Sequence, residues 1–159
     1  KKNGEFTVNI ALIYRNNPVI GIVHAPVLNK TWFGEQGKSA KKIEKGSTKT
    51  IKVKPHKHGE VYKVVGSRSH AGDSLNEFLN KLEKYKIVSI GSSIKLCLIA
   101  EGRAHLYPRF GPTSEWDTAA AHAVVNSAGG EVINYKTRES LKYNEKDSLR
   151  NPYFIVQPK

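Results

Sequence analysis

The sequence is poor in the residues that mark several classes of protein. Among its 159 residues there is one cysteine, Cys97, and no methionine. A single thiol excludes an intramolecular disulfide and a metal centre built on several thiolates. Because Cys97 lies in the apolar run from Ile94 to Ile99, we expect it to pack as a small core residue with no catalytic role. Without a methionine the chain also lacks an initiator, so Lys1 is not expected to be a natural start.

Long hydrophobic runs are missing as well. No apolar stretch approaches the ~20 residues that span a bilayer, and no signal-peptide core follows the N-terminal residues Lys1 to Gly4. We therefore expect no membrane span and a cytoplasmic location. A content of 38% hydrophobic and 25% charged residues is typical of a globular domain, and the length fits one such domain.

Acidic residues are few relative to basic ones, with 14 Asp and Glu against 26 Lys and Arg and a formal net charge of +12. This balance predicts anionic partners, and by itself it leaves open a nucleic acid, a membrane surface or a small polyphosphorylated substrate. Lysines concentrate in residues 38–57, which we interpret as a basic connector with one short strand at Ile51 and Val53. The segment has no interleaved aromatic residues for base stacking, which favours a solvated connector over a nucleic-acid track.

The first quarter of the chain is predicted to form an antiparallel meander of strands. Residues 6–14 alternate apolar and polar side chains with a period of two, as in a half-buried strand. A β-branched run at residues 19–23 follows the turn residues 15–18, so the two segments predict a hairpin. Residues 31–33 predict a third short strand.

From Tyr62 onward the pattern changes to strands alternating with helices, which predicts a mixed α/β layer with at least some parallel strands. The expected strands are residues 63–66, 86–90, 104–107, 131–135 and 153–156, and the expected helices are residues 74–85, 93–101 and 114–128. We predict two regions: residues 1–59, an antiparallel sheet with the basic connector, and residues 60–159, an α/β substrate-binding domain.

The segment from Ser89 to Lys95 is a candidate anion site. It places a glycine and two serines, Ser92 and Ser93, between a buried strand and the start of a helix. Free helix N–H groups, hydroxyls and the Lys95 ammonium would converge there on an anion. A serine that only caps the helix is the simpler interpretation of the same pattern.

The segment from Gly111 to His122 also allows two interpretations. Ser114 followed by Asp117 matches a capping box, in which the carboxylate accepts backbone N–H bonds at the start of a helix. Alternatively, a carboxylate held at a helix N-terminus beside a cleft suits a hard cation such as Mg²⁺. Magnesium in phosphoryl transfer needs further ligands, and the other acidic residues form no second motif, so any partners of Asp117 would lie outside this chain.

Several runs together resemble a known family. The runs are GSSIKLCLIAEGRA from Gly91, LYPR from Leu106, WDTAA from Trp116, AGG from Ala128, VGSRSH from Val65 and NGEFTVNIA from Asn3. In this combination they are similar to the CysQ-type 3'(2'),5'-bisphosphate nucleotidases of the inositol monophosphatase superfamily. The resemblance extends over essentially the whole chain. It implies a layered α-β-α-β sandwich, an antiparallel meander followed by a mixed sheet, and it favours the metal interpretation of Asp117.

The resemblance also implies roles for single residues. Asp117 would be the catalytic, metal-binding aspartate and would also face the substrate. Ser92, Ser93 and Lys95 would contact a substrate phosphate and the ribose, and Arg109 would hold a second phosphate, where inositol-specific relatives carry a glutamate. The remaining substrate-binding candidate is His70, at a position that contacts the nucleotide in the family; as an alternative it is a surface histidine after a turn.

The function implied is removal, with Mg²⁺ as cofactor, of the 3'-phosphate of adenosine 3',5'-bisphosphate, a small-molecule partner, to give AMP and phosphate. The family's metal-binding glutamate and its Asp-Pro-Ile/Leu-Asp-Gly-Thr motif are absent from this sequence. We therefore expect the N-terminal half of the same protein to be required and this chain alone to be inactive. The alternatives are an inositol or fructose bisphosphate phosphatase of the same superfamily and, from another class, a basic nucleic-acid-binding module; we expect no nucleic-acid partner.

Overall fold

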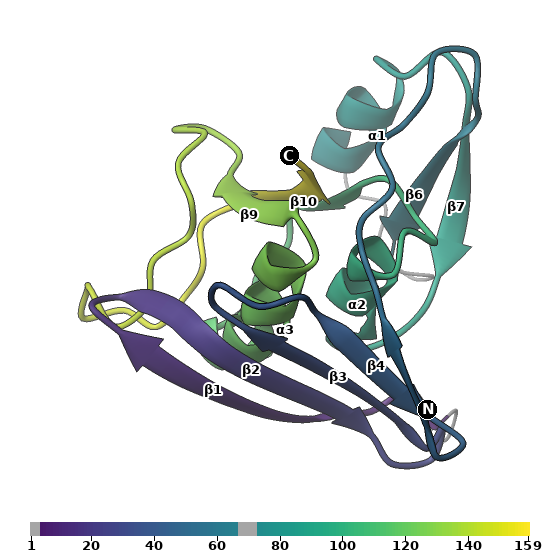
Figure 1. Ribbon diagram of the computed structural model, residues 1–159. Helices are drawn as coiled ribbons and strands as arrows, with labels where there is room; N and C mark the ends of the chain where they lie inside the picture. The colour runs from purple at the N-terminus through teal and green to yellow at the C-terminus, as the bar shows by residue number, and fades with distance from the viewer. Residues whose placement is uncertain (1–3, 67–72) are drawn as a thin grey trace.

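The first part of the chain folds into a five-stranded antiparallel sheet. The computed structural model describes residues 4–66 and 73–159, and all that follows concerns those residues. The sheet has the order β1 (Val8–Tyr14), β2 (Asn17–Ala25), β3 (Lys30–Glu35), β4 (Lys41–Glu44) and β5 (Ser47–Thr50) (Figure 1). Arg15 and Asn16, at φ 46° and 62°, form the two-residue turn between β1 and β2. The predicted meander is confirmed.

The prediction for residues 38–57 was wrong. Instead of a connector with one strand at Ile51 and Val53, β4 and β5 form a hairpin that extends the sheet. Its turn consists of Lys45 and Gly46, both at positive φ, as a tight hairpin requires. Ile51 and Val53 follow β5 outside any strand; Val53 is buried, and its N–H donates to the carbonyl of Ala128 at 3.0 Å. The apolar residues at 51 and 53 therefore do not mark a strand, and Val53 instead contacts the C-terminal end of the helix at residues 115–127.

The second part combines parallel and antiparallel strands. β6 (Tyr62–Gly66) and β7 (Tyr85–Ser89) pair in parallel, while β10 (Phe154–Pro158) pairs antiparallel with β8 (Tyr107–Arg109) and with β9 (Gly130–Asn134). A parallel bridge between Val64 and Leu106 connects the two groups of strands. The predicted mixed arrangement is confirmed, although the strand expected at 104–107 begins only at Tyr107.

The three helices of the described residues are α1 (Asp73–Leu79), α2 (Ile94–Ala100) and α3 (Glu115–Ser127). The helix predicted for residues 74–85 ends at Leu79, because the chain must reverse before Tyr85 to bring β7 alongside β6. The other two helices lie within one residue of the predicted bounds. Ser114 is the N-cap of α3, in extended conformation, as the capping-box pattern predicted.

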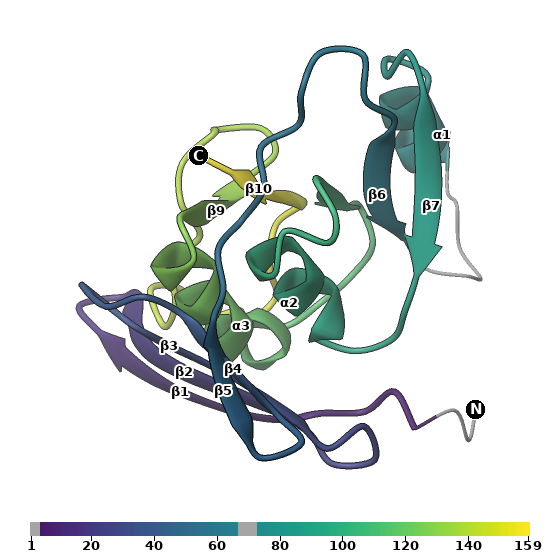
Figure 2. The same cartoon turned by 45° about the vertical axis from the view of Figure 1, so that its right-hand side comes forward.

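The elements stack in α-β-α-β order. α2 and α3 lie between the β1–β5 sheet and the layer of β6 to β10 (Figure 2). α1 lies outside that second strand layer, where the ring of Phe78 packs 5.7 Å from Phe110 and 6.2 Å from Tyr135. α3 approaches the first sheet closely at Gly34, where a Cβ would lie 2.5 Å from the Cα of Val124. The predicted layered sandwich is therefore confirmed.

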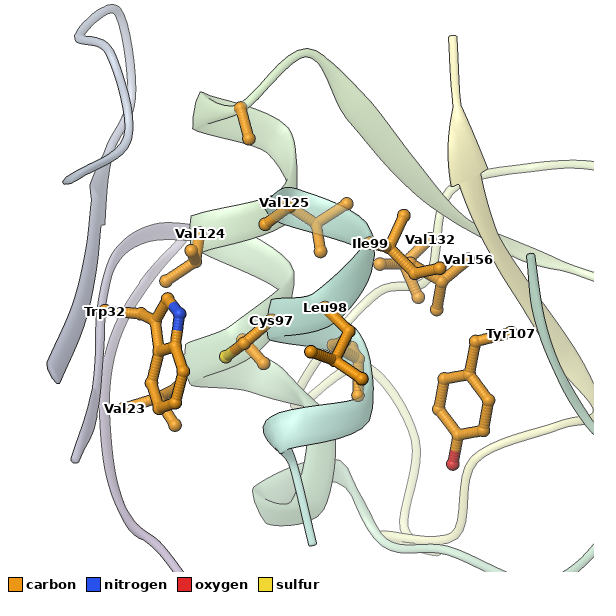
Figure 3. Close-up of a cluster of buried hydrophobic side chains, with 14 of the residues drawn as sticks. Val23, Trp32, Cys97, Leu98, Ile99, Tyr107, Val124, Val125, Val132 and Val156 are labelled. Atoms are coloured by element: carbon orange, nitrogen blue, oxygen red, sulfur yellow. The ribbon is translucent and has the colours of Figure 1, made fainter. Parts of the chain in front are cut away.

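The main core fills the space around the two central helices. Figure 3 shows Trp32 and Val23 of the first sheet facing the side of Cys97 and Val124, with Val132 and Val156 beyond Ile99. Cys97 is fully buried, and burial raises the pKa of its thiol well above the usual value, as expected for a core residue. The indole N–H of Trp32 donates to Glu101 Oε1 at 2.6 Å, which ties the sheet to the end of α2.

The β1–β5 sheet leaves one face open. Phe6, Val8, Ile10, Leu12 and Tyr14 alternate along β1 and its entry, and each is between 51% and 62% exposed. The other face of this sheet carries α3. In the described ranges no helix is both long and apolar enough to cross a membrane. The division into residues 1–59 and 60–159 stays a prediction.

Candidate active site

A pocket of about 220 Å³ opens where the two strand layers and the two central helices meet. It brings together five of the predicted site residues, Ser92, Ser93, Lys95, Arg109 and Asp117. The other lining residues are Asn9, Leu96, Tyr107, Pro112, Thr113, Thr118 and Phe154. His70, the sixth predicted residue, lies outside the described residues. Five of the six predicted residues thus share one pocket, and their roles in binding and catalysis stay a prediction.

The turn before α2 presents the two serine hydroxyls. Ser92 has φ 57°, a left-handed conformation that a serine adopts only where the surroundings hold it. Ser93 occupies the N-cap position of α2, as the simpler interpretation predicted, but its side chain makes no cap hydrogen bond. The Ser93 hydroxyl donates instead to Asn9 Oδ1 at 2.7 Å. Because α2 has only seven residues, we assign the anion site to these side chains and to no helix dipole.

The entry to β1 supports this turn from behind. The N–H of Gly91 donates to Glu5 Oε2 at 2.8 Å, and a Cβ at Gly91 would lie 3.0 Å from the same oxygen. Asn9 itself lines the pocket. These residues belong to the run NGEFTVNIA that carries the family resemblance, but the sequence alone gave them no predicted place in the site. The signal was present, since Glu5, Thr7 and Asn9 are the polar positions of the alternating segment.

Two cations share the pocket. Burial lowers the pKa of Lys95, and the Arg109 guanidinium lowers it further. Lys95 Nζ lies 5.9 Å from the centroid of the Tyr107 ring and 3.4 Å from the carbonyl oxygen of Ser92. Arg109 Nη2 donates to the carbonyl of Pro112 at 3.1 Å, while its Nε is buried with no hydrogen-bond partner. An anion would pair the free donor and relieve the repulsion between the two charges.

Asp117 lies on the first turn of α3, opposite these cations. Its Oδ2 accepts the N–H of Ser114 at 2.8 Å, so the capping interpretation is confirmed. The cap uses only one of the two carboxylate oxygens, so it is compatible with a ligand at the other. Asn151 braces the preceding turn by donating to the carbonyl of Ser114 at 2.8 Å and to Thr118 Oγ1 at 3.1 Å.

Tyr107 was missed by the sequence analysis. Tyr107 is 4% exposed, and its ring packs edge-on against the ring of Phe154, with 5.9 Å between the centroids. Burial raises the pKa of Tyr107 to about 12, so the phenol stays neutral at physiological pH. It gives the pocket an uncharged wall beneath Lys95.

A magnesium site is incomplete on the residues that the structure describes. Asp117 is the one carboxylate among the lining residues of the pocket, and within residues 4–66 and 73–159 no group of three His, Cys, Asp or Glu side chains is placed to hold a metal ion. A catalytic magnesium needs more oxygen ligands than one carboxylate. The described residues therefore do not fit a complete metal centre, and we derive no catalytic step through a metal from them.

Comparison with known proteins explains this combination of pocket and fold. A model of the inositol monophosphatase family matches residues 1–157. The chain belongs to the inositol monophosphatase family. The family match covers both the β1–β5 sheet and the pocket, so the two parts of the chain form one recognisable unit.

Within the family, the chain is most informatively compared with proteins named CysQ. It is 49% identical over 156 residues to the 3'(2'),5'-bisphosphate nucleotidase CysQ of Salmonella typhimurium, covering 98% of this chain and 61% of that protein. The CysQ of Aggregatibacter actinomycetemcomitans is 32% identical over 158 residues, with 98% and 58% covered. The chain thus spans 61% or less of the length of these curated relatives.

Solved structures agree on the fold. The crystal structure of CysQ from Bacteroides thetaiotaomicron matches 99% of this chain and 64% of that chain, at 38% identity and a TM-score of 0.88. An inositol monophosphatase from Zymomonas mobilis matches 97% of this chain and 58% of that chain, with a TM-score of 0.77 at 19% identity. The likeness to CysQ-type members of the family, predicted from the sequence, is confirmed.

Proposed function

We propose that this chain supplies the substrate pocket of a magnesium-dependent 3'(2'),5'-bisphosphate nucleotidase that converts adenosine 3',5'-bisphosphate to AMP and phosphate. One observation carries the proposal: Lys95 and Arg109 face the same pocket, and the buried Nε of Arg109 has no partner. Two cations in one pocket suit a substrate with two phosphates. The CysQ relatives are named 3'(2'),5'-bisphosphate nucleotidases, which supports the same class of substrate.

The proposal gives each pocket residue a task. Ser92, Ser93 and Lys95 bind one phosphate and the adjoining ribose, and Arg109 holds the second phosphate through its free donors. Asp117 is placed to bind a metal ion with the carboxylate oxygen that is not used in the cap. His70 contacts the nucleotide. Binding both phosphates fixes the scissile group, and this orientation is the part of the reaction that the described residues support.

The remaining metal ligands come, on this proposal, from an N-terminal part of the same protein. Two features support such a partner: the pocket contributes a single carboxylate, and one face of the β1–β5 sheet is apolar and open. Trp116, next to Asp117 in the sequence, is 63% exposed. The 159 residues alone would then lack phosphatase activity, and the intact enzyme would act in the cytoplasm.

The test compares phosphate release from adenosine 3',5'-bisphosphate by the intact enzyme and by the 159-residue chain, each with and without Mg²⁺. We expect magnesium-dependent release by the intact enzyme only. Robust release by the isolated chain would contradict the incomplete metal centre, and turnover of inositol or fructose bisphosphate in preference to the nucleotide would contradict the substrate. Binding to an arbitrary duplex with a steep log–log dependence on salt would favour a nucleic-acid partner instead.

A further inference from the structure

The hydroxyl of Thr7 lies directly behind the two pocket serines. Its Oγ1 is 2.5 Å from Ser92 Oγ and 2.8 Å from Ser93 Oγ. Asn9 Nδ2 donates to the same oxygen at 3.1 Å. Thr7 is not among the residues that line the pocket, whereas both serines and Asn9 are. The Thr7 hydroxyl, which lies outside the pocket, therefore contacts polar groups of three residues that line the pocket.

The hydrogens of this cluster can be assigned by counting. Asn9 Oδ1 only accepts, so the hydrogen of Ser93 goes to it, at 2.7 Å. The contact between Thr7 and Ser93 must then use the hydrogen of Thr7, and the contact between Thr7 and Ser92 must use the hydrogen of Ser92. Thr7 thus accepts two hydrogen bonds and donates one. In this arrangement the Ser92 hydrogen points away from the pocket.

An anion in the pocket requires the opposite orientation, because its oxygens accept hydrogen bonds and Ser92 must donate to it. A second arrangement satisfies this need with the same number of bonds. Ser93 turns its hydrogen from Asn9 to Thr7, Thr7 turns its hydrogen to Ser92, and Ser92 donates to the anion. The exchange replaces a neutral bond with a charge-assisted one, which is stronger. Only a group that both donates and accepts can serve both arrangements.

We propose that Thr7 is a positioning residue for phosphate binding. Without an anion, the Ser92 hydroxyl donates to Thr7; when an anion enters, Thr7 donates to Ser92, and the Ser92 hydroxyl donates to the anion. The inference rests on the proposed function, since it assumes that Ser92 and Ser93 contact a phosphate. Thr7 lies 85 residues from Ser92 in the sequence. The segment before β1 is therefore part of the machinery of a pocket formed mainly by residues 92–118.

The test uses Thr7→Val, which keeps the shape of the side chain and replaces the hydroxyl with a methyl group. A methyl carbon cannot approach an oxygen to 2.5 Å, so the substitution displaces both serines. It also removes the Thr7 hydroxyl to which they hydrogen-bond. Thr7→Ser keeps the hydroxyl. Thr48→Val, on the exposed strand β5, is the matched control. Each variant is made in the intact enzyme, which is titrated calorimetrically without Mg²⁺ with inorganic phosphate and with adenosine 3',5'-bisphosphate, and its fold is checked by circular dichroism.

We expect Thr7→Val to weaken phosphate and nucleotide binding by about tenfold, while Thr7→Ser and Thr48→Val stay within about twofold of the parent chain. Should the valine variant fail to fold, Thr7→Ala, which adds no clashing methyl, takes its place with the same expectation. Parent-like affinity of the variant without the hydroxyl would overturn the role of Thr7 and leave the proposed function standing. Failure of the intact parent enzyme to bind either ligand would overturn both.

Discussion

Asp117 Oδ2 accepts the backbone N–H of Ser114 at 2.8 Å, so the candidate metal ligand also caps the helix that carries it. The cap fixes the carboxyl group by a bond within its own helix turn. Only Oδ2 accepts this bond, so Oδ1 takes no part in the cap. The two interpretations of this residue from the sequence, cap and ligand, are therefore compatible at one position.

Two substitutions separate these roles. Asp117→Asn keeps an oxygen that can accept the cap bond but removes the charge, so we expect little change in stability and a loss of magnesium-dependent turnover in the intact enzyme. Asp117→Ala removes both, with an additional loss of about 1 kcal/mol of unfolding free energy. Urea unfolding and phosphate release are measured on the same preparations. Near-normal turnover by the asparagine variant would show that the charge is not needed.

Arg109 should decide selectivity between nucleotide and inositol phosphates. Arg109→Glu reverses the charge where the second phosphate is proposed to bind, so we expect turnover of adenosine 3',5'-bisphosphate to fall by roughly 100-fold, with a smaller loss for inositol monophosphate. Arg109→Lys should lie between the two, since lysine keeps the charge but lacks the forked donors. Equal losses for both substrates in the intact enzyme would contradict the assignment.

The lowered pKa of Lys95 predicts a pH-dependent affinity for anions. Burial and the nearby Arg109 favour the neutral amine, so Lys95 loses its proton at a lower pH than an ordinary lysine. Sulfate is a suitable probe because its own charge is constant at and above neutral pH. We expect sulfate affinity to fall as pH rises above neutrality, and the Lys95→Arg variant to lose this fall. A flat profile in the parent chain would count against Lys95 as a ligand.

The buried His122 should make the fold acid-sensitive. The pKa of His122 is lowered from 6.5 to about 3, mainly by burial and further by the positive charges of Lys142 and Lys159. Between these two values the unfolded chain binds a proton that the folded chain does not, so stability falls as pH falls from about 6.5 to about 3, and this contribution levels off below. The slope from this one group is at most about 1.4 kcal/mol per pH unit.

The variant His122→Asn tests this source of acid sensitivity. Nδ1 of His122 lies 2.9 Å from the hydroxyl of Tyr143, and an asparagine amide can make a similar bond without titrating. Unfolding by urea at about pH 7 and about pH 4.5 should show a smaller loss of stability for the variant than for the parent. An equal loss in both would assign the acid sensitivity to other groups.

The contact between α3 and the first sheet should not tolerate a side chain at Gly21. A Cβ at this position would overlap the carbonyl oxygen of Ala120 in α3. We expect Gly21→Ala to cost about 3 kcal/mol or more, because backbone on both sides must move. Gly46→Ala is the control: its site is open and only its φ of 74° opposes alanine, for which we expect a loss of about 1 kcal/mol. Similar melting temperatures of the two variants would contradict the close approach.

Local patterns were sufficient where a single element decides its own structure. The alternation of β1 and the Ser114 to Asp117 capping pattern predicted a strand and a helix start correctly, because both depend on neighbours a few residues apart. The β4–β5 hairpin was missed because its strands carry lysines and threonines on a half-exposed edge, where no apolar alternation marks them. The signal that remained was the turn pair Lys45-Gly46.

By itself, the sequence determined the meander of β1 to β3, the change to strands alternating with helices after Tyr62 and the cap of α3, and it named five residues that share the pocket. Only the tertiary structure decided that Thr7 and Asn9 stand behind Ser92 and Ser93, and that Tyr107 lies beneath Lys95. These contacts join residues that are up to 86 positions apart. No local pattern encodes them, because they form only when the buried faces of α2, α3 and both strand layers pack together.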